Sequence, residues 1–274
     1  MGQAARPGFD RPFRLRRPAR PTLRQLRLGS GLVLFAYVLT HLLVHALGNV
    51  SLDALETGLT VKVALWRTPP ALLLLYGALL IHLVLGLYAF YERRFYRVRP
   101  AETAQLLLGL AVPLLLLSHV VGTRLAWSLE GLDRGYAQVL YATWVAAPGQ
   151  GMMQAAGLVV AWLHGCFGLY FWLRLKRGFP GAAPWLLAGA VLVPVLALLG
   201  VVQGGRSVAL LAADPAWRAE ELGANHLGGA AQGERLSAVR RGLFSTYMAA
   251  LALVVLARGA RTFAETRGGF VRIG

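Results

Sequence analysis

The chain has 274 residues, of which 57% are hydrophobic, and its formal net charge at pH 7 is +16. A mean hydropathy of +0.55, together with several long apolar runs, excludes an ordinary water-soluble globular protein. The single cysteine, Cys166, excludes a disulfide framework.

Six apolar segments are each long enough to cross a bilayer, which takes about 20 residues. The predicted fold class is therefore an all-α membrane protein, a six-transmembrane helix bundle. In chain order we expect spans at about 28–48, 70–91, 104–127, 153–174, 184–204 and 241–258. The corresponding parts are a basic N-terminal segment 1–27, a five-helix bundle 28–204, an outer loop 205–240, a sixth transmembrane helix 241–258, and a tail or the start of a following domain at 259–274.

The charges between these spans are distributed unevenly. The segments on the side of the two termini hold 19 Lys/Arg and 4 Asp/Glu, whereas the opposite side holds 9 and 8. This positive-inside bias predicts that both termini are cytoplasmic. Topology and anionic lipid headgroups account for the net charge, so no nucleic-acid partner is predicted. Arginine outnumbers lysine by 26 to 2, which favours a GC-rich bacterial gene and hence the bacterial inner membrane.

Each of the first four predicted spans contains a histidine at a comparable position. His82 and His164 both begin the pattern His-x-x-x-Gly-Leu-Tyr, and His41 and His119 follow Thr40 and Ser118. These two alignments indicate a weak internal repeat, in which spans one and two resemble spans three and four. An ionisable group in a span is costly and is a functional candidate by default.

The predicted depths arrange the four histidines in two pairs. At a rise of about 1.5 Å per residue, His82 and His164 lie about 18 and 17 Å below the outer face. His41 and His119 lie about 10 and 12 Å below it. Imidazole is a common axial ligand of haem iron. We therefore predict a four-helix haem-binding core with two bis-histidine haems, the outer one held by His41 and His119 and the inner one by His82 and His164. The absence of a Cys-x-x-Cys-His motif makes both b-type.

Neighbouring residues add candidates with more than one interpretation. His45 lies one turn from His41 and is the alternative ligand, or a partner for a propionate, a quinone or the outer surface. Arg124 is a candidate for binding haem propionates, or it extends to the outer interface. Small residues near the histidine faces make room for a flat macrocycle, or they form close helix–helix contacts, the reading we favour. These glycines are Gly86, Gly157, Gly165 and Gly168.

Three other roles for the histidines are a zinc site, hydrogen bonding between helices and proton relay. A zinc site needs ligands clustered at one depth, and no Cys, Asp or Glu accompanies these residues. Interhelical hydrogen bonding explains one intramembrane histidine more readily than four in matched pairs. A transporter or scaffold in which the histidines relay protons stays as the non-haem alternative.

At these histidines the chain resembles the membrane anchor family of succinate dehydrogenase and fumarate reductase, in its single-chain di-haem form. A closer resemblance is to the membrane anchors of bacterial class III adenylate cyclases. It is carried by residues 27–35 (RLGSGLVLF), by the stretch from His41 through His45 to Leu52, and by a sixth span leading to residues 267–274 (RGGFVRIG).

The cyclase-type resemblance implies a di-haem redox sensor or anchor domain of an adenylate cyclase-like protein, with a homodimer, quinone as a further ligand, and ferredoxin-like and cyclase domains following in the cytoplasm. Residues 269–274 resemble the first strand of such a domain. The alternative is the cytochrome b anchor subunit of a succinate dehydrogenase or fumarate reductase, which passes electrons between an iron–sulfur subunit and quinone. The chain itself carries no catalytic domain in either interpretation.

Overall fold

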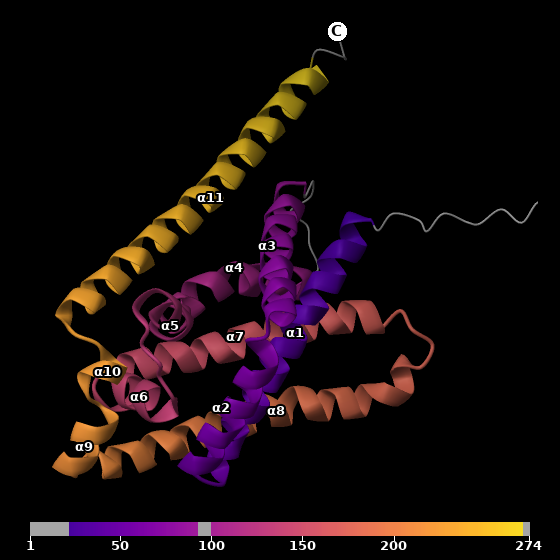
Figure 1. Ribbon diagram of the computed structural model, residues 1–274. Coiled ribbons are helices and arrows are strands. Elements are labelled where there is room, and N and C mark those ends of the chain that lie inside the picture. Colours follow the sequence, from indigo (N-terminus) through magenta and orange to yellow (C-terminus); the bar gives the residue numbers. More distant parts are fainter. Residues whose placement is uncertain (1–21, 93–99, 271–274) are drawn as a thin grey trace, which may run out of the picture.

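The computed structural model describes residues 22–92 and 100–270, and every regular element within them is a helix (Figure 1). Most of the predicted N-terminal segment, part of the connection between spans two and three, and the end of the predicted final strand lie outside these residues. The long helices are α1 (Leu23–Ala46), α2 (Leu52–Trp66), α3 (Pro69–Tyr91), α4 (Pro100–Val120), α7 (Pro148–Leu173), α8 (Phe179–Leu211) and α11 (Ala230–Phe270). The short ones are η1 (Leu47–Asn49), η2 (Val121–Leu125), α5 (Ala126–Glu130), α6 (Tyr136–Leu140), η3 (Tyr141–Val145), α9 (Pro215–Glu221) and α10 (Ala224–Leu227).

Six of the described helices are long and apolar enough to cross a membrane, as the hydropathy pattern predicts. They extend beyond the predicted spans, because helical turns continue into the flanking polar residues. Thr22 begins α1 with a reciprocal pair of hydrogen bonds to Gln25, a capping box. The fifth span continues to Leu211 and the sixth begins at Ala230, so the predicted outer loop 205–240 is much shorter and contains two short helices.

The four histidine-bearing spans form two antiparallel helix pairs. Helix α1 packs against α3, and α4 packs against α7. The pairs meet through α1 and α7, and α8 packs on both of these helices. Helix α11 packs on α3 and α4, on a different side of the bundle (Figure 1). The predicted repeat of spans one and two in spans three and four therefore corresponds to two similar helical hairpins.

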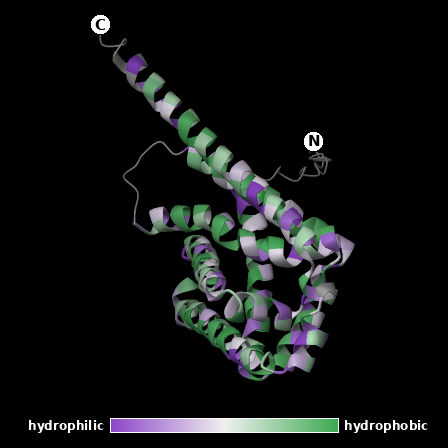
Figure 2. Ribbon diagram, turned by 90° about the vertical axis from the view of Figure 1, so that its left-hand side faces the viewer, coloured by the Kyte–Doolittle hydropathy of each residue, from purple (hydrophilic) through white to green (hydrophobic). Residues whose placement is uncertain are grey.

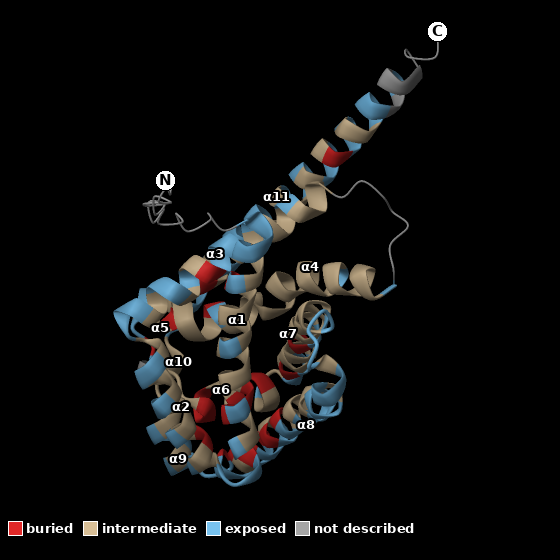
Figure 3. Cartoon of the chain, turned by 90° about the vertical axis from the view of Figure 1, so that its right-hand side faces the viewer, coloured by how far each residue is buried: buried red, intermediate tan, exposed pale blue. Residues whose placement is uncertain are grey.

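One end of the bundle is covered by short helices, and we call it the capped end; it carries α2, α5, α6, α9 and α10. The main buried core lies there and contains Val44, Leu55, Tyr136, Leu140 and Val208 (Figure 3). Along the spans the helices are coloured largely hydrophobic (Figure 2). Large apolar side chains such as Leu73 and Leu187 are exposed there, which suits a surface in contact with lipid.

The proline inside α8 has its missing hydrogen bond replaced by a neighbouring helix. Pro194 cannot donate to the carbonyl of Ala190, four residues earlier. The indole Nε1 of Trp162 on α7 donates to that carbonyl oxygen at 2.8 Å. Trp162 is itself buried and stacks on Phe35 of α1, with ring centres 5.1 Å apart. Lipid cannot donate a hydrogen bond to the free carbonyl of Ala190, so Trp162 does so, and this residue thereby joins α7 to α8 and, through Phe35, to α1.

The end of α1, continued by η1, crosses α8 at two glycines, Gly48 of η1 and Gly200 of α8, whose backbones are in contact. A Cβ atom placed on Gly48 would collide with the backbone of Gly200, and a Cβ on Gly200 would collide with the carbonyl of His45. Asn49 adds a side-chain hydrogen bond to the carbonyl of Leu196 at 2.8 Å. Small residues allow this approach, which is a common way for helices to associate in membranes.

Replacement of Gly200 tests this crossing. We expect Gly200→Leu to separate α1 from α8 and to cost about 1–3 kcal/mol or more, because overpacking forces backbone shifts. Gly189→Leu on the same helix is the control, since a Cβ there has no neighbour within 4 Å. Thermal unfolding in detergent should show a lower midpoint for Gly200→Leu only. Equal midpoints for the two variants would contradict the crossing.

Candidate functional site

The inner histidine pair joins the two hairpins. The rings of His82 on α3 and His164 on α7 have centres 6.0 Å apart, and their planes are nearly perpendicular, at 81°. The Nδ1 atom of His82 lies 3.1 Å from the carbonyl oxygen of Arg27 on α1. The Nδ1 atom of His164 lies 2.9 Å from the carbonyl oxygen of Gln105 on α4. Each histidine is thus oriented by the other helix of its own hairpin.

These hydrogen bonds determine which ring nitrogen of each inner histidine is free. A carbonyl oxygen only accepts, so Nδ1 of His82 and of His164 must carry the proton. The lone pair of a neutral imidazole then lies on Nε2. A carbonyl that fixes the ring and its tautomer is the usual support of a metal-binding histidine. Both inner histidines are therefore prepared to bind a metal through Nε2.

The two hairpins repeat this arrangement around a glycine. A Cβ atom on Gly31 would lie 2.9 Å from Cε1 of His82, and one on Gly109 would lie 2.6 Å from Cε1 of His164. Gly31 follows Arg27 by four residues, as Gly109 follows Gln105. Each glycine also precedes the outer histidine of its helix, His41 or His119, by ten residues. The repeat predicted from the histidines therefore extends to the residues that position them.

Sequence reasoning missed Gly31 and Gly109, although the shared spacing Gly-x9-His in spans one and three was a signal for them. Of the glycines that it singled out, Gly157 packs against Leu115 and Leu116 and Gly165 against Phe35, which are helix–helix contacts. Gly168 lies near the side chain of Gln105, and a Cβ on Gly86 would have no neighbour within 4 Å.

The outer pair lies toward the capped end. The rings of His41 on α1 and His119 on α4 have centres 5.8 Å apart. Gly31 contacts His82 of the inner pair and precedes His41 of the outer pair by ten residues of α1. At about 1.5 Å per residue, the two pairs are therefore about 15 Å apart along the helix axis. Two layers of paired histidines are therefore present, as predicted, but they are farther apart than the separation of about 5–8 Å that the predicted depths imply. Immediately after His119 the backbone widens into the π-helical turn η2, where Thr123 donates to the His119 carbonyl at 2.7 Å.

His45 also belongs to this outer cluster. Its ring centre is 4.4 Å from that of His41, and its Nδ1 lies 3.0 Å from the hydroxyl of Tyr136 on α6. Burial, with the nearby charge of Glu56, raises the pKa of Tyr136, so the phenol keeps its proton and can donate to His45. His41 is the residue whose position in the hairpin repeat matches His119. The geometry thus favours His41 as the partner of His119 and gives His45 a separate hydrogen bond.

Lys62 on α2 approaches the outer pair from the capped end. Its Nζ lies 2.9 Å from Nδ1 of His41 and donates to the hydroxyl of Tyr37 at 3.2 Å. Burial lowers the pKa of Lys62 to about 8, and the charge of Arg67 adds to this shift. Above this pKa the neutral amine can accept a hydrogen bond from Nδ1, which leaves the Nε2 lone pair of His41 free. Sequence reasoning missed Lys62, because it lies on a helix outside the predicted spans.

Both pairs have the spacing of a bis-imidazole metal site. Two imidazoles that bind one metal ion from opposite sides, through bonds of about 2.0 Å and with about 1.1 Å from each bonded nitrogen to its ring centre, have ring centres about 6 Å apart. The separations of 6.0 and 5.8 Å agree with this value. Within residues 22–92 and 100–270 no group of three or more His, Cys, Asp or Glu is placed to hold a metal ion. A bis-histidine haem needs only two protein ligands.

Arg124 lies just beyond the outer pair. Its Nε donates to the hydroxyl of Tyr76 at 2.6 Å, and its guanidinium lies over Trp127 at 4.6 Å. Its Nη1 is buried and has no hydrogen-bond partner among the described residues. A buried guanidinium N–H without an acceptor is costly. Arg124 is thus held inside the protein with one donor available to an anionic group such as a propionate.

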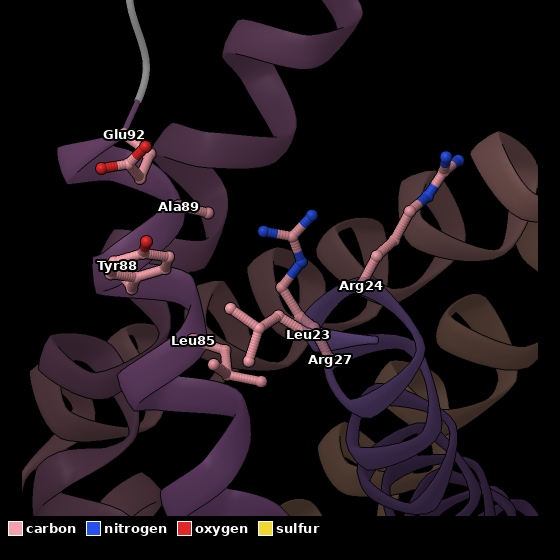
Figure 4. Close-up of a pocket in the computed structure, with 7 residues that line it drawn as sticks. All are labelled: Leu23, Arg24, Arg27, Leu85, Tyr88, Ala89 and Glu92. Carbon is pink, nitrogen blue, oxygen red and sulfur yellow. The ribbon is translucent and has the colours of Figure 1, made fainter. Parts of the chain in front are cut away.

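A cavity of about 310 Å³ opens between α1 and α3 at the uncapped end. Arg24, Arg27 and Tyr88 are among its lining residues, and Figure 4 shows the Arg27 guanidinium in the space between the two helices. Because the carbonyl of Arg27 contacts His82, this basic cavity adjoins the inner pair.

The remaining candidates lie outside both pairs. His226, on α10, has its Nδ1 3.2 Å from the carbonyl oxygen of Asp133 in the capped end. Cys166 packs beside the buried cluster of Leu42, Trp162 and Ala197. Comparisons with protein-family models, with curated proteins and with solved structures found no match to this chain.

Lys62 offers a direct test of the outer cluster, because Lys176 is the only other lysine. In the Lys176→Arg protein, Lys62 can be methylated with ¹³C-formaldehyde and titrated by NMR. We expect a midpoint near pH 8, since burial disfavours the ammonium form. The folded-state pKa is lowered, so ionisation of Lys62 should oppose folding increasingly as the pH falls below the unfolded value. A midpoint near the ordinary value of about 10.4 would show that Lys62 is solvated.

Proposed function

We propose that this protein is a di-haem b-type cytochrome of the bacterial inner membrane. Its outer haem would be held by His41 and His119 and its inner haem by His82 and His164. The observation that supports the proposal is the inner pair, in which two carbonyl oxygens hold the Nδ1 protons, so that both Nε2 atoms are unprotonated, and the ring centres are 6.0 Å apart. Haem supplies reversible one-electron chemistry to such a site.

The residues of the chain contribute binding, orientation and charge. The carbonyls of Arg27 and Gln105 hold the inner ring tautomers, and Gly31 and Gly109 allow the rings to approach α1 and α4. Arg124 provides a donor for an acidic group beside the outer pair. The surrounding apolar helices keep water away, which strengthens each of these interactions.

We further propose that the cytochrome acts as the redox-sensing anchor of an adenylate cyclase-like protein, with both termini in the cytoplasm and quinone as a second ligand. Helix α11 supports this interpretation. It has 41 residues, and at 1.5 Å each it is about 62 Å long, twice the thickness of the hydrocarbon core. Figure 1 shows it continuing beyond the other helices toward the C-terminus. Such a helix is long enough to extend from the level of the inner pair into the cytoplasm, where the proposed cyclase domain would follow.

The alternative is the cytochrome b anchor of a succinate dehydrogenase or fumarate reductase. The cavity beside Arg27 favours this alternative, because it adjoins the inner pair at the end where cytoplasmic iron–sulfur partners would bind. Co-purification with a flavoprotein and an iron–sulfur subunit would decide for the respiratory role. Isolation as a homodimer linked to a cyclase would decide for the sensor.

The cytochrome is tested first by the reduced-minus-oxidised absorption spectrum, with haem per polypeptide quantified. We expect two b-type haems in the native chain and one in each of His41→Ala, His82→Ala, His119→Ala and His164→Ala. The spectra should fall into two groups, 41 with 119 and 82 with 164. His45→Ala, the matched control in the outer cluster, should keep both haems. Protein made with ample haem that binds none, yet stays folded, would leave the transporter or scaffold interpretation.

The glycines beside the inner pair give a second test. We expect Gly31→Val and Gly109→Val to reduce the haem content from two to one per chain, because the added side chain displaces His82 or His164. The remaining haem should have the spectrum of the outer site. Gly86→Val is the control, since its position on α3 is open. Full haem content in both Gly31→Val and Gly109→Val would show that the rings are not confined as described.

A further inference from the structure

Helix α11 carries a buried arginine whose hydrogen-bond donors are not satisfied. Arg258 is only 4% exposed, and its Nε and Nη1 atoms have no hydrogen-bond partner in the structure of residues 22–92 and 100–270. A buried cation without an anion is strongly unfavourable, more so than a neutral polar group. Arg258 therefore has two buried donors for which the described residues offer no acceptor.

The surroundings of α11 place Arg258 on the side of the inner pair. Helix α11 packs on α3 and α4, which belong to different hairpins and are not themselves extensively packed together in the described part of the chain. Tyr247 on α11 donates to the carbonyl of Leu110 at 2.8 Å, next to the glycine that contacts His164. Farther along, Arg261 pairs with Glu92 of α3 at 2.8 Å. Helix α11 thus bridges the two hairpins through α3 and α4, and Arg258 is one of its buried residues.

The level of Arg258 can be estimated from this ion pair. Helices α3 and α11 both run toward the uncapped end, so Arg258, three residues before Arg261, lies about one turn nearer to the inner pair than Arg261 does. Glu92, which pairs with Arg261, follows His82 by ten residues, or about 15 Å. Helical side chains lean toward the N-terminus of their helix, so the guanidinium lies nearer to the level of His82 than its own Cα does. A carboxylate on the edge of a macrocycle held by His82 and His164 would extend toward this level.

We infer that Arg258 binds a propionate carboxylate of the inner haem. This inference rests on the proposed function. The planar guanidinium can donate two parallel hydrogen bonds to a carboxylate, and its free Nε and Nη1 atoms are the donors that such a contact uses. The contact gives α11 a direct electrostatic link to the inner haem. A change in haem charge or position then acts on the helix that leaves the membrane.

The inference is tested by redox titration of the full-length chain in the His119→Ala background, which should contain the inner haem alone. We expect Arg258→Gln to lower the midpoint potential, because loss of a nearby cation makes reduction less favourable. Arg258→Lys should give a smaller decrease, since the charge is kept and the paired geometry is lost. Arg261→Gln, one turn away and on the ion pair with Glu92, is the matched control and should change the potential least.

Reconstitution with haem dimethyl ester distinguishes a propionate from a lipid phosphate as the anion. The ester has no carboxylates, so with it Arg258→Gln should lower the potential by less than it does with ordinary haem. A decrease that is as large with the ester would overturn the inference and indicate a lipid phosphate or a purely through-space effect. Equal potentials in Arg258→Gln and Arg261→Gln with ordinary haem would also overturn it, while one haem per chain would leave the proposed cytochrome intact. Absence of haem from the native chain would instead overturn the proposed function.

Discussion

The hydrogen bonds from the inner histidines to the carbonyls of Arg27 and Gln105 are the interactions on which the arrangement of the site depends. A carbonyl within a helix has a second lone pair that can accept a bond from outside, and in hydrocarbon no water competes for it. Each bond joins a histidine to the neighbouring helix of its hairpin and orients the ring. Because the bond occupies the Nδ1 proton, it leaves Nε2 as the unprotonated nitrogen of each inner ring.

Duplication explains why two such sites can exist in one short chain. The spacing from the orienting carbonyl to the glycine and then to the outer histidine is the same in α1 and α4. The two sites nevertheless differ in their surroundings. His164 contacts a backbone carbonyl, and His82 contacts a backbone carbonyl and the hydroxyl of Ser30. In the outer cluster the histidines instead contact Lys62 and Tyr136 of the capped end. Different electrostatic surroundings at two otherwise similar sites would give two haems different potentials.

Helix α11 connects this site to the rest of the molecule in a way that the other spans do not. It contacts both hairpins, because its Tyr247 bonds to Leu110 of α4 and its Arg261 pairs with Glu92 of α3. It also continues past them toward the C-terminus (Figure 1). Its first turns are held at the capped end, where Arg235 pairs with Glu130 and Leu236 is buried beside Val121. The buried, unsatisfied Arg258 is the residue of α11 that a change in the separation of the hairpins would affect most directly.

The hydropathy of the sequence was sufficient to predict six spans, and helix rise was sufficient to place His41 with His119 and His82 with His164 at matched depths. These are one-dimensional properties, because length and depth follow from counting residues along a helix. The sequence also favoured helix–helix packing over space for a macrocycle as the role of Gly157 and Gly165. Both glycines do contact side chains of neighbouring helices.

Only the tertiary structure decided which side chains meet across helices. Helix association in a membrane depends on shape and on polar partners, which hydropathy does not specify. Gly31 against His82, Trp162 on the carbonyl freed by Pro194, and Lys62 on His41 are therefore contacts between segments far apart in the chain. The sequence by itself was sufficient to predict which histidines lie close together, because their pairing follows from position along the helices. The packing of the hairpins determined which nitrogen of each inner histidine is free and which charges surround both pairs.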